Sequence, residues 1–380
     1  MHFLEILFFS LLFLSGYSYS VYPVIVFSLS RLFGNPWNTK EIMPAVSIII
    51  SVYNEERLIE EKIRNALSLE YPKGLLEIIV SSDGSDDRTN EIVSGHKDSG
   101  IILYAFTERC GKTECLNRVV PLAKGEIIFF TDSNSVFPPD TVATMVRNFW
   151  DGQVGLVTGW TKYGQLRGGE GTTGVYTRLE TVTKFWESLI SSCVGADGAI
   201  FAMRKCLYKP LFNEDINDFV IPLHVISQNH RVVLDPKVFC LEEPAESPQK
   251  EFQRQVRMTN RTLSAIRRNP KFLNPFQPHF FGFFLLSHKV LRFLVPFFLL
   301  GTFLTNLLIL GLSPFYVIFL AAQIFTIVFV LAALIFRIEG RLLHFCKIFF
   351  IILSAQIVGW KRMISGQSDV IWTPQRKVSQ

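Results

Sequence analysis

The chain has 380 residues and a formal net charge of +5, and 49% of its residues are hydrophobic, including 35 phenylalanines. The mild charge, without clustered arginines and interleaved aromatic residues, argues against nucleic acid as a partner. Six scattered cysteines without C-x-x-C spacing or a histidine cluster argue against a zinc site or a disulfide framework and are typical of a reducing compartment.

The hydrophobic residues concentrate at the two ends of the chain, beginning with residues 3–30. A helix needs about 20 such residues to cross a bilayer. A secretory signal peptide would instead need a basic start and a small-residue cleavage site, whereas this stretch stays apolar past Gly16. We therefore expect residues 1–33 to be a retained transmembrane anchor. Arg31 and Lys40 follow it, so the positive-inside rule places the next domain in the cytosol.

Residues 44–245 have a globular composition, in which apolar runs alternate with amphipathic segments. The runs are VSIIIS (46–51), LEIIVSS (76–82), IILYAF (101–106), EIIFFT (126–131) and VGLVTG (154–159). The segments between the first four are long enough for crossover helices. This pattern predicts an α/β domain with a mostly parallel sheet and helices on both faces. Ligands of such sheets bind at the carboxyl ends of the strands.

Residues 246–278 are basic and polar, which predicts an amphipathic helix at the membrane interface, ended before Pro270. Membrane character returns in residues 279–362. Within this region, residues 290–311 and 315–336 are predicted to cross the bilayer as a pair joined by a short uncharged turn.

Residues 342–360 are also apolar, but they carry His344, Lys347 and Gln356. We expect an in-plane or re-entrant helix here, which leaves residues 363–380 as a cytosolic tail. The sequence thus predicts a multi-pass membrane protein whose globular domain faces the cytosol.

Polar side chains follow three of the predicted strands. The first is followed by Tyr53, Asn54 and Glu55, and the second by Asp83. The alternative is helix capping and turn formation, with Asn54 capping a helix at 55–68 and Asp86 capping another at 87–94.

The fourth strand is followed by Asp132 and Asn134. An Asx turn is one interpretation. The other is that the two side chains give hard oxygen ligands to Mg²⁺ or Mn²⁺, which would also bind diphosphate oxygens.

The stretch RCGKTECLN (109–117) contains Gly-Lys-Thr but is not a P-loop, because Phe106 stands where the first glycine of that motif is required. Lys112 remains a candidate phosphate contact. Its alternative role is that of a solvated lysine at a helix start.

Six motifs in order complete the pattern: VSIIISVYNEE, IIVSSDGSDD, GKTECLN, FTDSNSVFPPD, GADGAIFAMRK and NDFVIPLHV. From about residue 44 to the tail, the chain resembles the inverting glycosyltransferases of family 2, which have the nucleotide-diphospho-sugar-binding GT-A fold. It most resembles the membrane-embedded branch that contains cellulose and hyaluronan synthases. The resemblance implies nucleotide contacts for Tyr53, Asn54, Glu55, Asp83, Lys112 and Arg257.

By the same resemblance, Asp132 and Asn134 occupy the metal-binding D-x-D motif, for Mg²⁺ or Mn²⁺. Asn134 replaces the second aspartate, so weaker metal affinity is expected. Asp218 falls at the position of the catalytic base, although it could also cap a helix at 219–229.

Gly195, Asp197 and Gly198 match the family's acceptor-side loop and would contact the donor or acceptor sugar. The alternative is a tight turn before a strand at 199–203. These two interpretations stay open at this point.

Arg254 and Arg257 match the spacing of a Q-x-x-R-W element, with Arg254 in place of the Gln and Met258 in place of the Trp that floors the acceptor channel in processive relatives. Arg257 would bind the diphosphate and Arg254 would lie near the sugar. Trp372 and Arg376 resemble a terminal W-x-x-x-R element that closes over the nucleotide.

The resemblance implies an enzyme that transfers sugar, with inversion, from a nucleotide-sugar, usually a UDP-sugar, to a glycan or lipid-linked acceptor at the cytoplasmic face of the bilayer. The product would be an exopolysaccharide, capsule or cell-envelope glycan. The alternatives are single-sugar transfer to a polyprenyl-linked acceptor and a catalytically silent sugar-nucleotide-binding membrane protein.

Overall fold

The computed structural model describes residues 2–164, 174–243, 247–274, 280–336 and 340–367. These residues form two compact units. The sheet unit contains the described residues of 26–244 and 268–284. The helical unit contains those of 1–25, 245–267 and 285–368.

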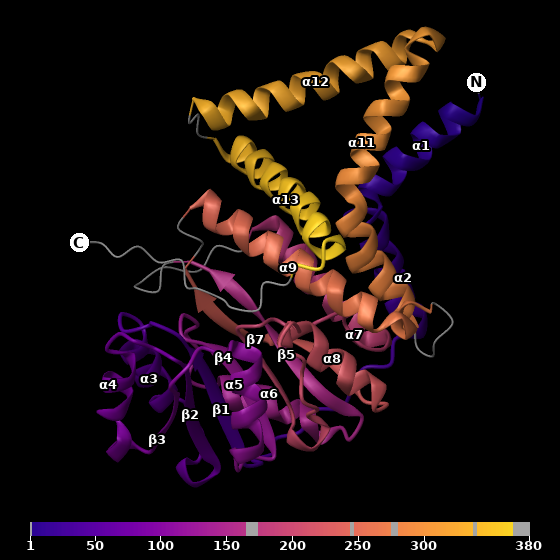
Figure 1. Ribbon diagram of the computed structural model, residues 1–380. Coiled ribbons are helices and arrows are strands. Elements are labelled where there is room, and N and C mark those ends of the chain that lie inside the picture. The colour runs from indigo at the N-terminus through magenta and orange to yellow at the C-terminus, as the bar shows by residue number, and fades with distance from the viewer. Residues whose placement is uncertain (1, 165–173, 244–246, 275–279, 337–339, 368–380) are drawn as a thin grey trace. The chain divides into compact units, whose positions relative to one another are not determined.

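The sheet unit is built on seven strands in the order β3-β2-β1-β4-β6-β5-β7 (Figure 1). Their bounds are β1 Val46–Val52, β2 Leu76–Asp83, β3 Ile101–Phe106, β4 Ile127–Asp132, β5 Val154–Tyr163, β6 Phe201–Arg204 and β7 Arg231–Glu242. The pairings β3-β2-β1-β4 and β5-β7 are parallel, while β6 runs antiparallel to both β4 and β5. The five predicted strands and the mostly parallel sheet are confirmed.

The centre of the sheet is buried on both faces. Ile48, Ile49 and Ile50 of β1 are all fully buried, which explains the continuous apolar run instead of an alternating one. Ser51 pairs with Ser81 of β2 and with Asp132 of β4. The carboxyl ends of these three strands therefore lie level at one edge of the sheet.

Six α-helices connect these strands: α3 Ile59–Leu67, α4 Thr89–Ser94, α5 Lys112–Val119, α6 Thr141–Val146, α7 Val175–Ile190 and α8 Asn217–Ser227. Short 3-10 helices are η1 Lys73–Leu75, η2 Lys97–Ser99, η3 Val120–Leu122, η4 Arg147–Trp150, η5 Lys205–Leu207 and η6 Pro270–Leu273.

The alternative prediction that Asn54, Asp86 and Asp218 are helix N-caps is wrong. The N-cap residues of α3, α4 and α8 are Leu58, Arg88 and Ile216, none with a side-chain cap. Asn54 and Asp86 bond each other across two loops instead, and Asp218 lies inside the first turn of its helix. The side chains of Asn54, Asp86 and Asp218 therefore do not cap these helices.

The remaining helices include the apolar segments: α1 His2–Tyr17, α2 Val21–Phe33, α9 Pro248–Arg268, α10 Phe281–Leu285, α11 Leu291–Ile309, α12 Pro314–Ile335 and α13 Arg341–Ile364. A π-helical turn, η8 Leu286–Val290, joins α10 to α11, and the 3-10 turn η9 Leu310–Leu312 follows α11.

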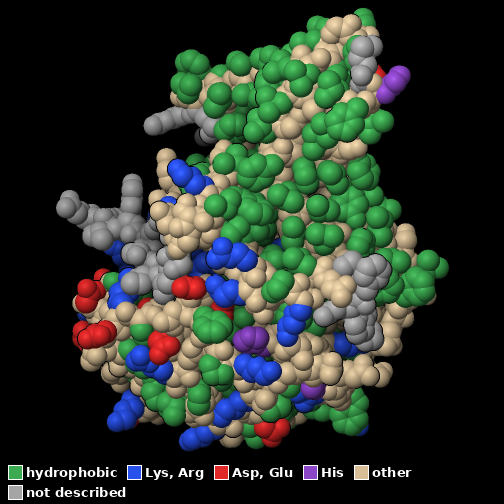
Figure 2. Space-filling model, turned by 45° about the vertical axis from the view of Figure 1, so that its right-hand side comes forward, with side chains coloured by type: hydrophobic (Ala, Val, Ile, Leu, Met, Phe, Trp, Pro, Cys, Tyr) green, Lys and Arg blue, Asp and Glu red, His purple; other side chains and the backbone are tan. Residues whose placement is uncertain are grey.

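Two of these segments, Phe281–Leu312 and Pro314–Ala333, are long and apolar enough to cross a membrane, in agreement with the two predicted C-terminal crossings. Many of their large hydrophobic side chains are exposed, and Figure 2 shows hydrophobic groups gathered over these helices. Helices α1 and α2, in the predicted anchor, pass the same test together but are bent by 61°, as in a broken span or a re-entrant loop. Helix α13 is not among the described helices that are long and apolar enough to cross a membrane.

Within the helical unit, α13 packs closely on α9. A Cβ placed on Gly359 would lie 2.7 Å from Cβ of Thr259, so only glycine allows this approach. The indole N–H of Trp360 donates to the carbonyl of Phe293 at 2.8 Å. This second contact ties α13 to α11.

The substitution Gly125→Ala is expected to destabilise the sheet unit by about 1–3 kcal/mol. The added Cβ would lie 2.4 Å from the backbone nitrogen of Ser47 and 2.7 Å from the carbonyl carbon of Val46, and backbone atoms cannot yield cheaply. Thermal unfolding of the purified protein measures the effect. Gly74→Ala is the control, because nothing lies within 4 Å of its Cβ position. Equal melting temperatures for the two variants would contradict the packing argument.

Candidate active site

The loops after β1 and β2 are joined by reciprocal hydrogen bonds. Asn54 has a positive φ of 51°, which its short polar side chain tolerates. Its side-chain nitrogen donates to Asp86 Oδ1 at 2.6 Å, and the Asp86 N–H donates back to Asn54 Oδ1 at 3.0 Å. The Glu55 N–H donates to Thr89 Oγ1 at 2.8 Å. Two predicted nucleotide contacts are thus fixed against the loop that follows Asp83.

Asp83 ends β2 and is 6% exposed. Its Oδ1 accepts the N–H groups of Cys110 at 2.7 Å and Gly111 at 3.1 Å. Arg109 Nε lies 3.9 Å from Asp83 Oδ2, and the guanidinium carbon lies 3.5 Å from the ring centroid of Tyr53. The segment 109–111 therefore gathers Tyr53 and Asp83, two predicted nucleotide residues, at the start of α5. Arg109 was missed by the sequence prediction.

Asp132 ends β4, and Lys112 Nζ donates to its Oδ1 at 2.5 Å. The Asp132 side chain is 40% exposed. Asn134 is partly exposed as well, whereas Ser133 and Ser135 are buried. Burial alternates from residue to residue through this turn, which leaves the two predicted metal ligands on the accessible side of the loop. The predicted phosphate contact thus lies beside the predicted metal position.

A buried lysine holds this loop in place through two hydrogen bonds. Lys62 is 1% exposed, and its Nζ donates to Thr131 Oγ1 at 3.0 Å and to the Ser135 carbonyl at 2.6 Å. On the other side of the loop, Ser135 Oγ donates to Glu242 Oε1 at 2.5 Å. Lys62 shares the apolar face of α3 with Ile59, which is the sequence signal that could have identified it.

The stability of the protein is expected to rise with pH because of Lys62. Burial lowers the pKa of Lys62 from its ordinary value of 10.5 to about 7. Between these values the unfolded chain binds the proton and the folded chain does not, so the free energy of unfolding rises by up to about 1.4 kcal/mol per pH unit. Melting temperatures of the wild type and Lys62→Met, compared from pH 7 upwards, test this. The melting temperature of the wild type should rise with pH relative to that of the variant.

The exposed Lys97→Met variant is the control for this measurement, and it should show no such pH-dependent difference. A constant difference between the wild type and Lys62→Met across the pH range would contradict a buried neutral lysine.

Asp218 lies in the first turn of α8, against the loop that contains Gly195 and Gly198. The Ala196 N–H donates to the Asp218 carbonyl at 2.7 Å. A Cβ on Gly198 would lie 3.0 Å from Asp218 Oδ2, and Gly195 has a φ of 79°. Gly195 therefore has a backbone conformation that favours glycine, and Gly198 leaves room for the close approach of the predicted base.

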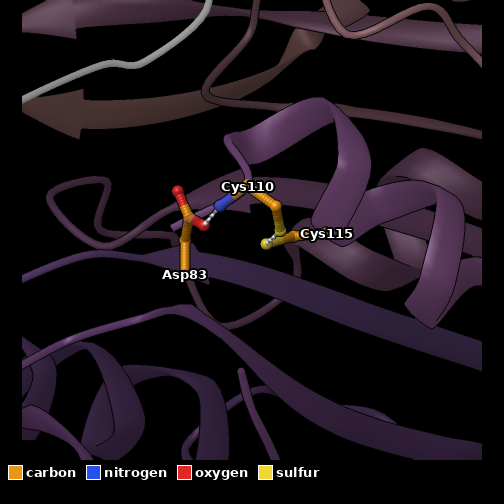
Figure 3. Close-up of side chains that lie close together, drawn as sticks. All are labelled: Asp83, Cys110 and Cys115. Atoms are coloured by element: carbon orange, nitrogen blue, oxygen red, sulfur yellow. Dashed lines mark hydrogen bonds between the residues drawn. The ribbon is translucent and has the colours of Figure 1, made fainter. Parts of the chain in front are cut away.

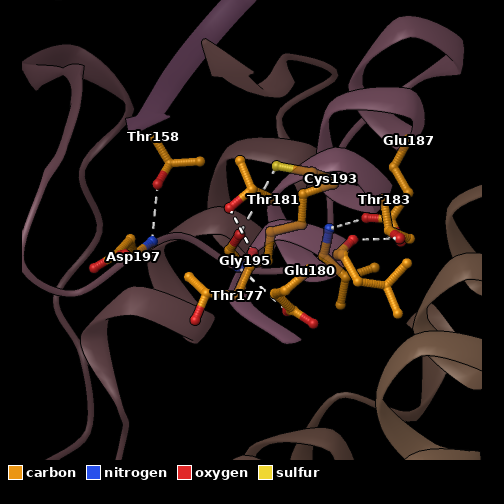
Figure 4. A network of polar contacts seen from close by, with 12 residues as sticks. Thr158, Thr177, Glu180, Thr181, Thr183, Glu187, Cys193, Gly195 and Asp197 are labelled. Carbon is orange, nitrogen blue, oxygen red and sulfur yellow. Dashed lines mark hydrogen bonds and ion pairs between the residues drawn. The ribbon is translucent and has the colours of Figure 1, made fainter. Parts of the chain in front are cut away.

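Asp197, between the two glycines, is held by hydrogen bonds to β5 and to its own loop. Its Oδ2 accepts from Thr161 Oγ1 at 2.9 Å and its Oδ1 accepts from the Ala199 N–H at 3.1 Å. The Asp197 N–H donates to Thr158 Oγ1, as Figure 4 shows within a wider polar network. Burial raises the pKa of Asp197. These contacts make Asp197 an anchor of its loop.

The sheet topology brings Asp218 to the same edge as Asp132. Because β6 is antiparallel and its Phe201 pairs with Phe130, the loop before β6 lies where β4 ends. In addition, Thr113 Oγ1, in the first turn of α5, donates to the carbonyl of Asp215 at 3.0 Å. The segments carrying Asp83, Lys112, Asp132, Asn134, Gly195, Gly198 and Asp218 thus converge at one edge of the sheet.

Two further predicted residues belong to the other compact unit. Arg254 and Arg257 lie on α9, in the helical unit, where Arg254 Nε lies 3.0 Å from Glu251 Oε2. Trp372 and Arg376 lie outside the described residues.

Residues 47–204 match the family model of Glycosyl transferase family 2. The chain is 31% identical over 140 residues to beta-monoglucosyldiacylglycerol synthase of Trichormus variabilis, covering 35% of this chain and 30% of that protein. It is 30% identical over 119 residues to poly-beta-1,6-N-acetyl-D-glucosamine synthase of Staphylococcus aureus, covering 31% and 28%. The aligned part thus spans less than a third of each relative.

Among solved structures, the mannosyltransferase PcManGT from Pyrobaculum calidifontis, in complex with GDP-Man and Mn²⁺, is similar with a TM-score of 0.72. The similarity covers 96% of this chain and all of that chain at 21% identity, which shows the fold alone. The fold is therefore α/β and GT-A-like. Residues 47–204 thus form the part of the chain that matches the Glycosyl transferase family 2 model.

Proposed function

We propose that the chain transfers a sugar, with inversion, from a nucleotide-sugar to a glycan or lipid-linked acceptor at the cytoplasmic face of a membrane. The expected donors are UDP-sugars. The observation that carries the proposal is that the segments with Asp218 and Asp132 converge at one sheet edge, with Asp218 against Gly198 and Asp132 beside Lys112. The domain family and the two apolar segments long enough to span a bilayer support it.

In this mechanism, Asp218 accepts the proton of the acceptor hydroxyl as that oxygen attacks the anomeric carbon. A single displacement inverts the configuration at that carbon, so an α-linked donor gives a β-linked product. Tyr53, Asn54 and Asp83 would hold the nucleoside. Lys112 would place its positive charge near the diphosphate.

The donor set at the end of β4 fits a hard divalent cation, because Asp132 and Asn134 both offer oxygen atoms from partly exposed side chains. These two residues would hold the ion. When bound there, Mg²⁺ or Mn²⁺ supplies charge neutralisation for the departing diphosphate. The hydrogen bonds of Lys62 to Thr131 and Ser135 keep the loop in the conformation that exposes both ligands.

Two products remain candidates. Extension of an exopolysaccharide, capsule or envelope glycan is the first, and the similarity to a poly-N-acetylglucosamine synthase supports it. The second is addition of one sugar to a lipid-linked acceptor, favoured by Met258 at the position of the channel tryptophan of processive relatives.

The test is nucleotide release by the detergent-purified protein with a panel of UDP- and GDP-sugars, in Mg²⁺ and in Mn²⁺. We expect turnover of at least one UDP-sugar. Product analysis with membranes and labelled donor separates long polymer from single lipid-linked addition. If no donor is turned over, the proposal fails and the catalytically silent alternative gains.

A further inference from the structure

Two thiols and a carboxylate meet beside the proposed nucleotide site (Figure 3). The sulfur atoms of Cys110 and Cys115 are 3.4 Å apart, and the potential ligand atoms of Asp83, Cys110 and Cys115 all lie within 4.8 Å of one another. Among the described residues, this is the group of three or more His, Cys, Asp or Glu side chains close enough to hold a metal ion.

The spacing of five residues hid this pair from the sequence prediction. In a continuous helix, side chains three or four apart are neighbours. Cys110 instead precedes α5, and Gly111 turns the chain with a φ of 88°. This turn brings the Cys110 sulfur back to Cys115, which is 1% exposed on the inner face of α5.

The geometry suits a tetrahedral ion with soft ligands. Zinc–sulfur bonds of about 2.3 Å at a tetrahedral angle give a sulfur–sulfur separation of about 3.8 Å, so the two thiols need only a small outward shift. The protein supplies three ligands, which leaves a fourth position for water or an added ligand. Thiolates select zinc-like ions over Mg²⁺ and Mn²⁺.

The surroundings orient and balance such a site. The N–H groups of Cys110 and Gly111 fix the Asp83 carboxylate, in the manner of outer-shell hydrogen bonds to a metal ligand. A carboxylate has four lone-pair positions, so these bonds do not exhaust its capacity. Arg109 Nε, 3.9 Å from Asp83 Oδ2, together with a divalent ion balances the charge of two thiolates and one carboxylate.

We propose that Asp83, Cys110 and Cys115 form a binding site for a thiophilic divalent cation, with Zn²⁺ as the type ion, and that its occupation prevents nucleotide binding. The second clause rests on the proposed function, in which Asp83 contacts the nucleoside. On binding, two S–H bonds break, two sulfur–metal bonds form and two protons pass to solvent. No electron is transferred, so the process needs no oxidant.

The test uses Co²⁺ as a spectroscopic probe on the reduced, purified full-length protein with excess Mg²⁺ present. We expect thiolate-to-cobalt charge-transfer absorption and the visible bands of a tetrahedral ion, both lost on adding Zn²⁺. The bands should be absent in Cys110→Ser and in Cys115→Ser. They should persist in the matched control Cys206→Ser, because Cys206 is exposed and lies outside the group formed by Asp83, Cys110 and Cys115.

Cys115 is buried, so Cys110→Ser, at a partly exposed position, is the decisive variant if Cys115→Ser fails to fold. Equilibrium binding of UDP then tests the second clause. Zn²⁺ should weaken UDP binding to the wild type and lose this effect in Cys110→Ser.

Absence of the charge-transfer band, or its persistence in Cys110→Ser, overturns the metal site. An equal effect of Zn²⁺ on UDP binding in the wild type and Cys110→Ser overturns the coupling. If the band is present but UDP does not bind under any condition, the nucleotide role of Asp83 fails and the coupling fails with it, while the cation site itself stands.

Discussion

The substitution Asp218→Asn is expected to lower the rate of glycosyl transfer by about 10²–10⁴-fold, which is the range for loss of a general base. The amide has the shape of the carboxylate but cannot take the proton of the acceptor hydroxyl. The contact between the Ala196 N–H and Asp218 uses the backbone carbonyl, so the substitution leaves it in place. Nucleotide binding should therefore persist. Nucleotide release and equilibrium binding of UDP measure the two properties.

The control for this experiment is Asp98→Asn, at an exposed position in η2. It should transfer sugar at the wild-type rate. If Asp218→Asn also keeps that rate while its melting temperature is unchanged, the proton acceptor must be another group. Loss of UDP binding together with transfer would instead indicate a structural role for the Asp218 carboxylate at Gly198.

The second large effect is expected from Asp132→Ala. Removal of the carboxylate should lower transfer by about 10²-fold or more, because a divalent ion contributes several kcal/mol of charge stabilisation to such reactions. The variant should also lose the dependence of its rate on Mg²⁺ or Mn²⁺. Rates at increasing metal concentration, and after chelation with EDTA, provide the measurement.

Asn134→Asp is the matched variant. It restores a second carboxylate to the loop, so half-maximal activation should occur at a lower metal concentration than in the wild type. Because Lys112 bonds Asp132 directly, Asp132→Ala removes this ion pair as well as a metal ligand. The variant Lys112→Met removes the ion pair alone and so distinguishes the two effects. Metal-dependent transfer in Asp132→Ala would show that the ion is held elsewhere.

The sequence predicted the fold where the burial pattern is local. The parallel strands carry uninterrupted apolar runs, and their bounds agree within a residue or two over the first four strands. Strand β7 was missed, because Asp235, Pro236 and Lys237 interrupt its run. The structure shows register shifts in its pairing with β5 near this interruption. The reversed direction of β6 has no local signature, since it depends on which edge its neighbours leave open.

The site was predictable to the extent that it follows from strand ends. Asp83, Asp132 and Asn134 were predicted to lie at one edge of the sheet because parallel strands deliver their last residues to the same edge. Lys62 and the Cys110–Cys115 pair were missed for different reasons. A lysine inside an apolar stripe is identified only when its acceptors, here on a loop some 70 positions later, are known. The cysteine pair depends on one turn at Gly111.

The reversal at β6 divides the candidate site between two parts of the chain. Loops 53–55, 83–88, 109–112 and 131–135 all precede it in the chain, whereas the loop with Gly198 comes immediately before β6 and Asp218 after it. Strand β6 is short and pairs with β4 on one side and with β5 on the other. The two halves of the candidate site, remote in the chain, are therefore held together by the backbone hydrogen bonds of this one strand.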